Sequence, residues 1–326
     1  MSDKPNLLIV LSPEHYVLRN LEPLRDVADM HVGTDDEFLD RFASTADVIL
    51  FSGFVGGVPF EPIWRRAKRV KWIHSLSAGV ESMLIPDFVN SPVLLTNARG
   101  VFAPSLAEFA VMGMLYFYKR VRRLVDSQRA HRWDGFLVDW LRGKTMGVVG
   151  YGEIGRECAR LAKALGVKIY ATRRNPHRSQ NDPIVDRMFA SEDLHAMLRE
   201  VDVVLAAAPL TPETKHMLGA PEFAVMKPTA IVINVGRGPV VHEAALVEAL
   251  QSKKIAAAAL DVYEVEPLPK DSPMWDMENV LISPHCTDRT TDPDWLDLSA
   301  LCFVDNFFRF IKGEPLNNIV DKKAGY

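Results

Sequence analysis

The chain has 326 residues, of which 48% are hydrophobic and 25% charged, a balance typical of a soluble globular protein of about two domains. The formal net charge of −4 argues against a general nucleic-acid binder. The cysteines, Cys158, Cys286 and Cys302, fit neither a disulfide framework nor a zinc motif, so we predict no metal site. Near the N-terminus, the apolar run Leu7 to Leu11 is too short for a signal peptide or a membrane span. We therefore expect a cytoplasmic protein without membrane or nucleic-acid partners.

Strand-like and helix-like segments alternate through the first part of the chain. This alternation predicts a parallel α/β fold. An apolar helix is predicted to begin at Pro104, a favoured first-turn residue, and to run to Arg123. The basic run Lys119 to Arg132 is interpreted as a solvated helix face or a subunit interface. The predicted strands are Leu7 to Leu11, Val48 to Phe51, Trp72 to Ser75 and Val93 to Thr96.

A glycine-rich turn follows in chain order. It lies between a predicted strand, Thr145 to Val149, and a predicted helix, Arg156 to Leu165. Its Gly-x-Gly-x-x-Gly spacing suits a tight turn, a close approach to a pyrophosphate, and close packing of helix on strand. The helix start also presents N–H groups and a positive dipole end to the phosphates. The predicted cofactor contacts here are Gly150, Tyr151, Gly152, Glu153, Ile154 and Gly155.

The next strand, Val167 to Ala171, is followed by Thr172-Arg173-Arg174. An NAD site usually has Asp or Glu at this position to bind the ribose 2′-hydroxyl, whereas an NADP site offers Arg. Arg can bind a 2′-phosphate through two parallel hydrogen bonds, and Thr172 could add a hydroxyl. We predict NADP as the preferred cofactor, with NAD possible. The alternative is that the arginines only solvate a surface loop.

Further strands complete the dinucleotide-binding domain, bringing its predicted number to six, as in a full doubly wound sheet. They are Val203 to Ala207, Ile231 to Asn234, Ala256 to Leu260 and Val280 to Ile282. A final periodic apolar segment, Trp295 to Ile311, predicts a helix that returns to the N-terminal domain.

Several motifs in this order together resemble the D-isomer-specific 2-hydroxyacid dehydrogenase family, in its glyoxylate/hydroxypyruvate reductase-like branch, over nearly the whole chain. The motifs are Ser77 to Glu81, the glycine turn, Ile233 to Gly238, Asp261 to Pro267 and Ser283 to His285. The resemblance implies an α/β fold in which a Rossmann domain (99–285) is inserted into a flavodoxin-like substrate domain (1–98 and 286–326), both with doubly wound parallel sheets. It also implies NAD(P)H-dependent reduction of a small 2-keto acid to the D-2-hydroxy acid, and the reverse, with the hydride leaving nicotinamide C4.

Such a reduction needs a cation for the carboxylate, an acid for the carbonyl oxygen and a partner for that acid. Arg237, Glu266 and His285 each follow a predicted strand, where open α/β sheets bind ligands. We predict that Arg237 binds and polarises the substrate, that His285 is the acid/base, and that Glu266 pairs with its other ring nitrogen. Each residue alone would be interpreted as a surface or structural residue, but their convergence indicates a site.

The resemblance implies further contacts that spacing alone does not. Backbone amides of Ser77, Ala78 and Gly79 would receive the substrate carboxylate, and Asp261 would lie near the nicotinamide carboxamide. A homodimer is implied through the helix near Pro104 and the segment around Trp133. After His285, this chain has Cys286-Thr287-Asp288, where the family commonly has Ile-Gly-Gly. Because of this departure, the resemblance does not indicate which keto acid is the substrate. The remaining cofactor contacts implied are Ala208, Pro209, Thr214, Val235, Gly236, Arg237 and His285.

Two alternatives stay open. A resemblance to the formate dehydrogenase branch would imply Gln at the position of Glu266. The presence of Glu266 therefore disfavours a formate dehydrogenase-like enzyme. A dinucleotide-sensing transcriptional corepressor shares the scaffold and can retain the three residues, but the chain has no obvious partner-binding extension. Histidines without strand-end support are interpreted as structural or surface residues, namely His74, His131, His195, His216 and His242.

Overall fold

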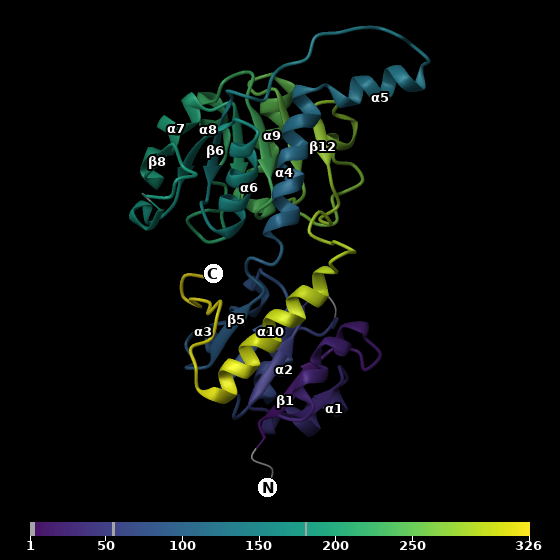
Figure 1. Cartoon of the computed structure of the whole chain (residues 1–326), viewed down its shortest axis with the longest axis vertical. Helices are drawn as coiled ribbons and strands as arrows, with labels where there is room; N and C mark the ends of the chain where they lie inside the picture. Colours follow the sequence, from purple (N-terminus) through teal and green to yellow (C-terminus); the bar gives the residue numbers. More distant parts are fainter. Residues whose placement is uncertain (1–3, 54–55, 180) are drawn as a thin grey trace. The chain divides into compact units, whose positions relative to one another are not determined.

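The computed structural model describes residues 4–53, 56–179 and 181–326. The chain divides into two compact units, Met1–Phe102 with Arg289–Tyr326, and Ala103–Asp288 (Figure 1). The breaks therefore fall after Phe102 and Asp288. The sequence predicts both breaks a few residues earlier, after residues 98 and 285.

The first unit is built on a five-stranded parallel sheet of order β2-β1-β3-β4-β5. This is the flavodoxin-like order, so the predicted fold class is confirmed here. The sequence pattern does not predict β2, a short edge strand whose four residues are only partly buried. The strands are β1 (Asn6–Val10), β2 (Asp29–Val32), β3 (Val48–Phe51), β4 (Trp72–Ser75) and β5 (Leu94–Asn97).

The last helix of the chain, α10 (Trp295–Lys312), packs in this first unit (Figure 1). Its N-cap, Asp294, accepts the amides of Leu296 and Asp297, and the helix ends at Gly313, whose φ of 69° suits glycine. The buried rings of Phe303 and Phe307 belong to one apolar core with Leu7, Ile9 and Trp72. The other helices of this unit are α1 (Asp36–Phe42), α2 (Phe60–Arg66) and α3 (Pro86–Val89).

The second unit contains a seven-stranded parallel sheet of order β12-β11-β10-β9-β6-β7-β8. It has the doubly wound Rossmann order with one strand added, so the prediction of six strands is one short. The missed strand, β8 (Arg187–Phe189), has only three residues, too few for a visible pattern. The others are β6 (Thr145–Val149), β7 (Lys168–Thr172), β9 (Val203–Ala206), β10 (Ile231–Asn234), β11 (Ala257–Leu260) and β12 (Val280–Ile282).

Helices cover both faces of this sheet, because alternate side chains of a strand point to opposite faces. A Cβ at Gly113 of α4 would lie 2.9 Å from Ala259 and 3.6 Å from Ile233, so α4 packs closely on one face. Val232 and Ala258 instead share a core with α7, α8 and α9. The helices are α4 (Ala103–Tyr118), α5 (Val121–Arg129), α6 (Glu153–Ala164), α7 (Leu194–Glu200), α8 (Ala220–Val225) and α9 (Glu243–Gln251).

The prediction of one continuous helix from Pro104 to Arg123 is wrong. The chain turns at Arg120, whose φ of 52° lies in the left-handed region, so α4 ends and α5 begins in a new direction. Helix α5 projects away from the sheet of this unit, and the extended segment after it returns to the unit (Figure 1), with Trp133, Leu137 and Trp140 exposed. Among the described residues, every helix is too short or too polar to span a bilayer.

Candidate active site

Arg237, Glu266 and His285 lie on the loops that follow three neighbouring strands. These strands end at Asn234, Leu260 and Ile282, and the order β12-β11-β10 makes them adjacent. In a parallel sheet the carboxyl ends of all strands meet at one edge, which is where such folds bind ligands. The sheet therefore carries the three loops side by side.

Glu266 and His285 are in direct contact. Oε2 of Glu266 lies 2.6 Å from Nδ1 of His285, and both side chains are partly shielded from solvent. The other carboxylate oxygen of Glu266 accepts the amide of Tyr263 at 3.0 Å. The carboxylate is thus oriented by its own loop, and it fixes the imidazole so that a proton would be exchanged with substrate at Nε2.

The backbone at His285 is unusual, since its φ of 49° lies in the left-handed region that favours glycine. Asp261, which is buried, stabilises this turn. Its Oδ1 accepts the Ser283 hydroxyl at 2.8 Å and the amides of Cys286 and Thr287 at 3.2 and 3.3 Å. Asp261 therefore binds the chain on both sides of His285, as an anion does in a backbone nest.

Cys286 and Thr287 make these bonds through backbone amides, which any residue except proline supplies. The departure of Cys286-Thr287-Asp288 from the family pattern therefore does not remove the hydrogen bonds of this loop to Asp261. The departure changes only the side chains of the loop.

Tyr263 is a site-supporting residue that sequence reasoning missed. Its hydroxyl lies 2.9 Å from the Ser283 carbonyl and 3.0 Å from that of Leu260, so it joins the loops after β11 and β12. Burial raises the pKa of the Tyr263 hydroxyl, which keeps it a donor. A Cβ at Gly238 would lie 1.8 Å from the Tyr263 carbonyl oxygen. The sequence feature that could have indicated this role is that Tyr263 is the aromatic residue of the motif Asp261 to Pro267.

Arg237 follows β10 in extended conformation and is partly buried. Its carbonyl accepts the side-chain amide of Asn234 at 3.1 Å, and Oδ1 of Asn234 accepts the Gly236 amide at 3.1 Å. Nη1 of Arg237 lies 2.9 Å from the Gly236 carbonyl. The end of β10 therefore fixes the backbone from which the guanidinium projects.

The glycine turn has the shape that a pyrophosphate needs. Gly150 has a φ of 94°, and a Cβ there would lie 2.5 Å from the backbone of Ala208. A Cβ at Gly155 would lie 2.5 Å from the Gly150 carbonyl, whereas one at Gly152 meets nothing within 4 Å. Gly152 is also the N-cap of α6 and offers no side-chain acceptor to its first amides. Open space above bare helix amides fits a dinucleotide phosphate.

Thr172 is the last residue of β7, and Arg173 and Arg174 follow it. Thr172 is buried, which disfavours the predicted contact of its hydroxyl with a 2′-phosphate. Arg173 donates to the Ser179 hydroxyl. Nη2 of Arg174 lies 4.0 Å from Oε2 of Glu213, and both side chains are mostly exposed. Of the two arginines, Arg173 is partly buried and Arg174 is exposed.

The loop after β9 is braced internally. Oγ1 of Thr214 donates to the Pro209 carbonyl at 2.6 Å and accepts the Thr211 amide at 2.8 Å. A Cβ at Gly236 would lie 2.9 Å from the Ala208 carbonyl, and the Val235 amide binds Ala206 at 3.1 Å. The structure thus gives Thr214 a bracing role and brings this loop against the one that carries Arg237.

Ser77, Ala78 and Gly79 belong to the first unit, in the loop after β4. The Ser77 amide binds the Ser75 hydroxyl at 3.2 Å, and the Ala78 carbonyl accepts the side-chain amide of Asn97 at 2.5 Å. The loop is therefore held in place by β4 and β5 within its own unit.

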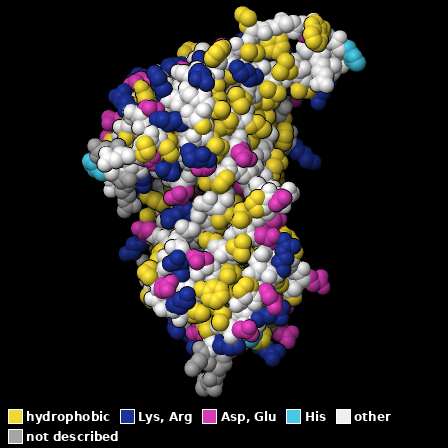
Figure 2. All heavy atoms as spheres, viewed as in Figure 1, with side chains coloured by type: hydrophobic (Ala, Val, Ile, Leu, Met, Phe, Trp, Pro, Cys, Tyr) yellow, Lys and Arg dark blue, Asp and Glu magenta, His cyan; other side chains and the backbone are white. Residues whose placement is uncertain are grey.

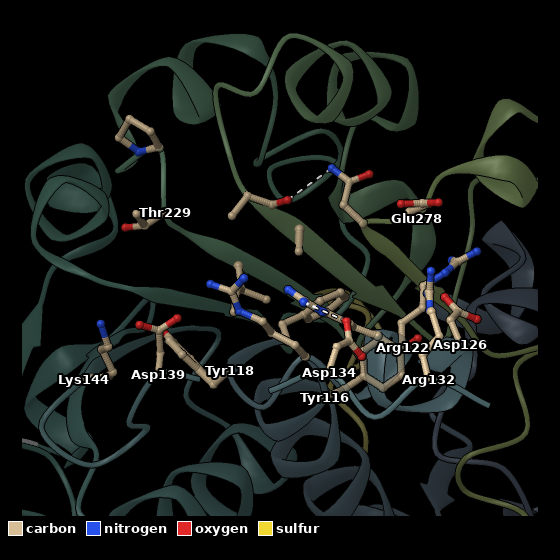
Figure 3. Close-up of a pocket in the computed structure, with 18 residues that line it drawn as sticks. Tyr116, Tyr118, Arg122, Asp126, Arg132, Asp134, Asp139, Lys144, Thr229 and Glu278 are labelled. Atoms are coloured by element: carbon tan, nitrogen blue, oxygen red, sulfur yellow. Dashed lines mark hydrogen bonds and ion pairs between the residues drawn. The ribbon is translucent and has the colours of Figure 1, made fainter. Parts of the chain in front are cut away.

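A cavity of about 920 Å³ lies at the opposite edge of the seven-stranded sheet (Figure 3). It is bordered by the first residues of β10 and β11, Ile231 and Ala257, and by the end of α4 and the segment after α5. Its labelled side chains include Arg122, Arg132 and Lys144 beside Asp126, Asp134 and Asp139 (Figure 3). Charges of both signs line this cavity. It is separate from Arg237, Glu266 and His285, which we call the triad.

Comparison with known proteins agrees with this geometry. The family model described as D-isomer specific 2-hydroxyacid dehydrogenase, NAD binding domain, matches residues 111–287, more than half of the chain. Glyoxylate/hydroxypyruvate reductase B of Cronobacter sakazakii is 33% identical, over 98% of this chain and 99% of its own.

Solved structures superpose over nearly the whole chain. A D-isomer specific 2-hydroxyacid dehydrogenase from Xanthobacter autotrophicus, in complex with NADPH and MES, has a TM-score of 0.85 at 28% identity, covering 99% of this chain and all of its own. An NADPH-dependent glyoxylate/hydroxypyruvate reductase from Sinorhizobium meliloti, in complex with NADP and sulfate, has a TM-score of 0.83 at 26% identity, with 99% and 100% coverage. The fold, the ordered motifs and these matches agree, and the chain belongs to the D-isomer-specific 2-hydroxyacid dehydrogenase family of oxidoreductases.

Proposed function

We propose that this protein reduces a small 2-keto acid to the D-2-hydroxy acid with NADPH, and catalyses the reverse reaction. The observation that carries the proposal is the 2.6 Å contact between Glu266 and His285 on loops adjacent to that of Arg237. The carboxylate orients the imidazole, which is the general acid that a reductase needs. The reductase names of the relatives support this reaction class.

The roles of the residues follow from their chemistry. The planar fork of Arg237 binds the carboxylate and carbonyl oxygens of the keto acid and stabilises charge that develops on the carbonyl. His285 donates the proton from Nε2 to that oxygen, while Glu266 holds the imidazolium in place. Bound nicotinamide supplies the hydride. Backbone amides of Ser77, Ala78 and Gly79 receive the substrate carboxylate, and in the oxidation His285 takes the proton back.

NADPH is the proposed reductant because no acid follows β7. Arg173 and Arg174 would bind the 2′-phosphate, the first-turn amides of α6 the pyrophosphate, and the loop that contains Ala208, Pro209 and Thr214 the adenosine side. Two of the superposed structures contain NADP or NADPH, which supports the choice. NAD remains usable in this proposal, since the glycine turn does not depend on the 2′-phosphate.

The proposed assembly is a homodimer formed through the second unit, in the cytoplasm. An apolar groove between α4 and α6 is lined by residues that include Val111, Met112, Leu115 and Leu165, and Figure 2 shows hydrophobic side chains gathered on the face where Figure 1 shows α4. Trp133 and Leu137 in the segment after α5 are almost fully exposed. Apolar side chains in such a patch are typical of an interface.

The contact of Glu266 with His285 also disfavours formate oxidation, which needs no proton relay. A dinucleotide-sensing transcriptional corepressor would bind the cofactor but would not reduce keto acids efficiently. The deciding experiment assays glyoxylate, hydroxypyruvate and longer 2-keto acids with NADPH and NADH in parallel, with His285→Ala as the matched inactive control. Turnover of at least one keto acid that is lost in His285→Ala supports the proposal, whereas cofactor binding without turnover of any keto acid contradicts it.

A further inference from the structure

A second cluster of chemically capable side chains lies outside the triad. His216, His242 and Glu264 each offer one nitrogen or oxygen ligand atom, and these atoms lie within 4.8 Å of one another. Across residues 4–53, 56–179 and 181–326, no other group of three His, Cys, Asp or Glu side chains is this close. The sequence predicts both histidines to be structural or surface residues, because the cluster forms only when separate loops meet.

The contact between His216 and Glu264 is not an ordinary hydrogen bond. Nε2 of His216 lies 3.1 Å from Oε1 of Glu264, yet Nε2 is buried and has no hydrogen-bond partner. The ring nitrogen is therefore close to the carboxylate without pointing at it. Two ligands of one tetrahedral ion stand in this relation, since bonds of 2.0–2.1 Å place neighbouring ligand atoms roughly 3.3 Å apart.

Each member of the cluster is held by backbone bonds. The amide of His216, whose φ is 57°, donates to the Pro239 carbonyl at 2.7 Å. His242 is the N-cap of α9, where Nδ1 accepts the Ala245 amide at 3.2 Å. Oε1 of Glu264 accepts the amide of Glu243 at 2.8 Å. Three segments of the second unit are thereby brought to one point.

The local charge favours a cation. Oε2 of Glu243 accepts the Glu264 amide at 3.2 Å, so two carboxylates lie beside two imidazoles. A divalent ion would offset the negative charge of the two carboxylates.

We propose that His216, His242 and Glu264 bind a divalent transition-metal cation of the zinc class. Two imidazoles and one carboxylate form a ligand set that suits Zn²⁺ and leaves its fourth position to water. On His242, Nε2 is the nitrogen left to ligate, and the proton then moves to Nδ1 at the expense of the bond from Ala245. The ion would join the start of α9 to the loop after β11, which also carries Glu266, and so stabilise the edge of the sheet that holds the triad.

The test measures Zn²⁺ binding to the full-length protein after chelator treatment, by isothermal titration calorimetry, with Co²⁺ as a spectroscopic probe of coordination. We expect one ion per chain, a Co²⁺ spectrum of low coordination number, a higher Tm with Zn²⁺, and weaker binding in acid because imidazoles ligate only when neutral. His216→Gln, His242→Ser and Glu264→Gln should each weaken binding at least about 10-fold. Serine keeps an N-cap for α9, and glutamine keeps an acceptor for the Glu243 amide.

Two controls separate this site from others. His195 lies 2.7 Å from Glu222 as a histidine–carboxylate pair outside any described group of three, so His195→Gln should bind Zn²⁺ as the unmodified protein does. His285→Ala should also retain the ion. Failure of the unmodified protein to bind Zn²⁺, equal binding in the three cluster variants, or loss of the ion in His285→Ala would overturn the proposal.

Discussion

Asp261 binds the chain on both sides of His285. One carboxylate oxygen accepts Ser283 before the histidine and the amides of Cys286 and Thr287 after it. A residue with a φ of 49° persists only where its surroundings hold it. Asp261 is therefore a positioning residue for the acid/base, in addition to the cofactor contact that the family resemblance implies.

Replacing Asp261 separates these two roles. Asp261→Asn keeps a carbonyl oxygen in place, whereas Asp261→Ala leaves two amides and a hydroxyl unpaired, at about 1–3 kcal/mol each. We expect Asp261→Ala to unfold at lower urea concentration and to lose roughly 100-fold in kcat, since small misplacements of a catalytic group have effects of that size. Asp261→Asn should lose much less. If both variants lose activity equally while binding NADPH equally well, the positioning role is wrong.

Arg237 should not be replaceable by lysine. Lysine keeps the positive charge but lacks the planar fork, so Arg237→Lys should raise KM for the keto acid and lower kcat/KM, with NADPH affinity nearly unchanged. Steady-state kinetics with the keto acid and a separate NADPH titration measure the two effects. Keto acid kinetics within about twofold of the unmodified enzyme would exclude Arg237 as the clamp.

Cofactor preference should depend on the arginines after β7. Arg173→Ala and Arg174→Ala should each reduce the kcat/KM advantage of NADPH over NADH, because a charged contact to a phosphate contributes about 1.5–3 kcal/mol. Thr172→Val is the matched control and should change little, since Thr172 is buried. An unmodified enzyme that uses NADH as well as NADPH would contradict the assignment.

Acid stability should depend on His74, which is fully buried in β4 with Nδ1 2.7 Å from the Thr96 hydroxyl. Burial lowers the pKa of His74 from 6.5 to about 3. The folded state therefore disfavours the proton, and its contribution to stability is complete above about pH 6.5 and is lost as the pH falls toward 3. We expect the free energy of unfolding to fall by about 3 kcal/mol more between pH 7 and pH 4 in the unmodified protein than in His74→Leu.

Urea unfolding at both pH values measures this difference. Leucine removes the titrating group, and Thr96 keeps the indole N–H of Trp72 at 2.8 Å. Parallel acid losses in the two proteins would show that His74 is not the responsible group.

The fold was largely predictable because its central strands are continuous apolar runs. Val48–Phe51 and Ile231–Asn234 are entirely buried and read as buried parallel strands. The edge strand β2 and the three-residue β8 were missed, since neither buries a full apolar face. The sequence does not predict the break at Arg120, because the residues around it favour a helix and the left-handed backbone of Arg120 does not alter the apolar pattern.

The site was predictable only to the level of residue type and strand end. Glu266 and His285 were paired from their chemistry, but the nest that Asp261 makes with backbone amides depends on dihedral angles that no motif encodes. Tyr263 was missed because its role is to join two loops. His216 and His242 come together with Glu264 only after the segments around β10 and β11 have folded.

The most direct test of the proposed chemistry is kcat/KM for keto acid reduction in three proteins: the unmodified enzyme, Glu266→Gln and His285→Ala. Loss of the general acid in His285→Ala should lower kcat/KM roughly 100-fold to 10,000-fold, with NADPH binding retained. Glu266→Gln keeps the shape of the side chain but removes the negative charge 2.6 Å from the ring, so it should also lower kcat/KM while NADPH binding is retained. Unchanged kcat/KM in Glu266→Gln, or an active His285→Ala, would show that this pair does not supply the proton.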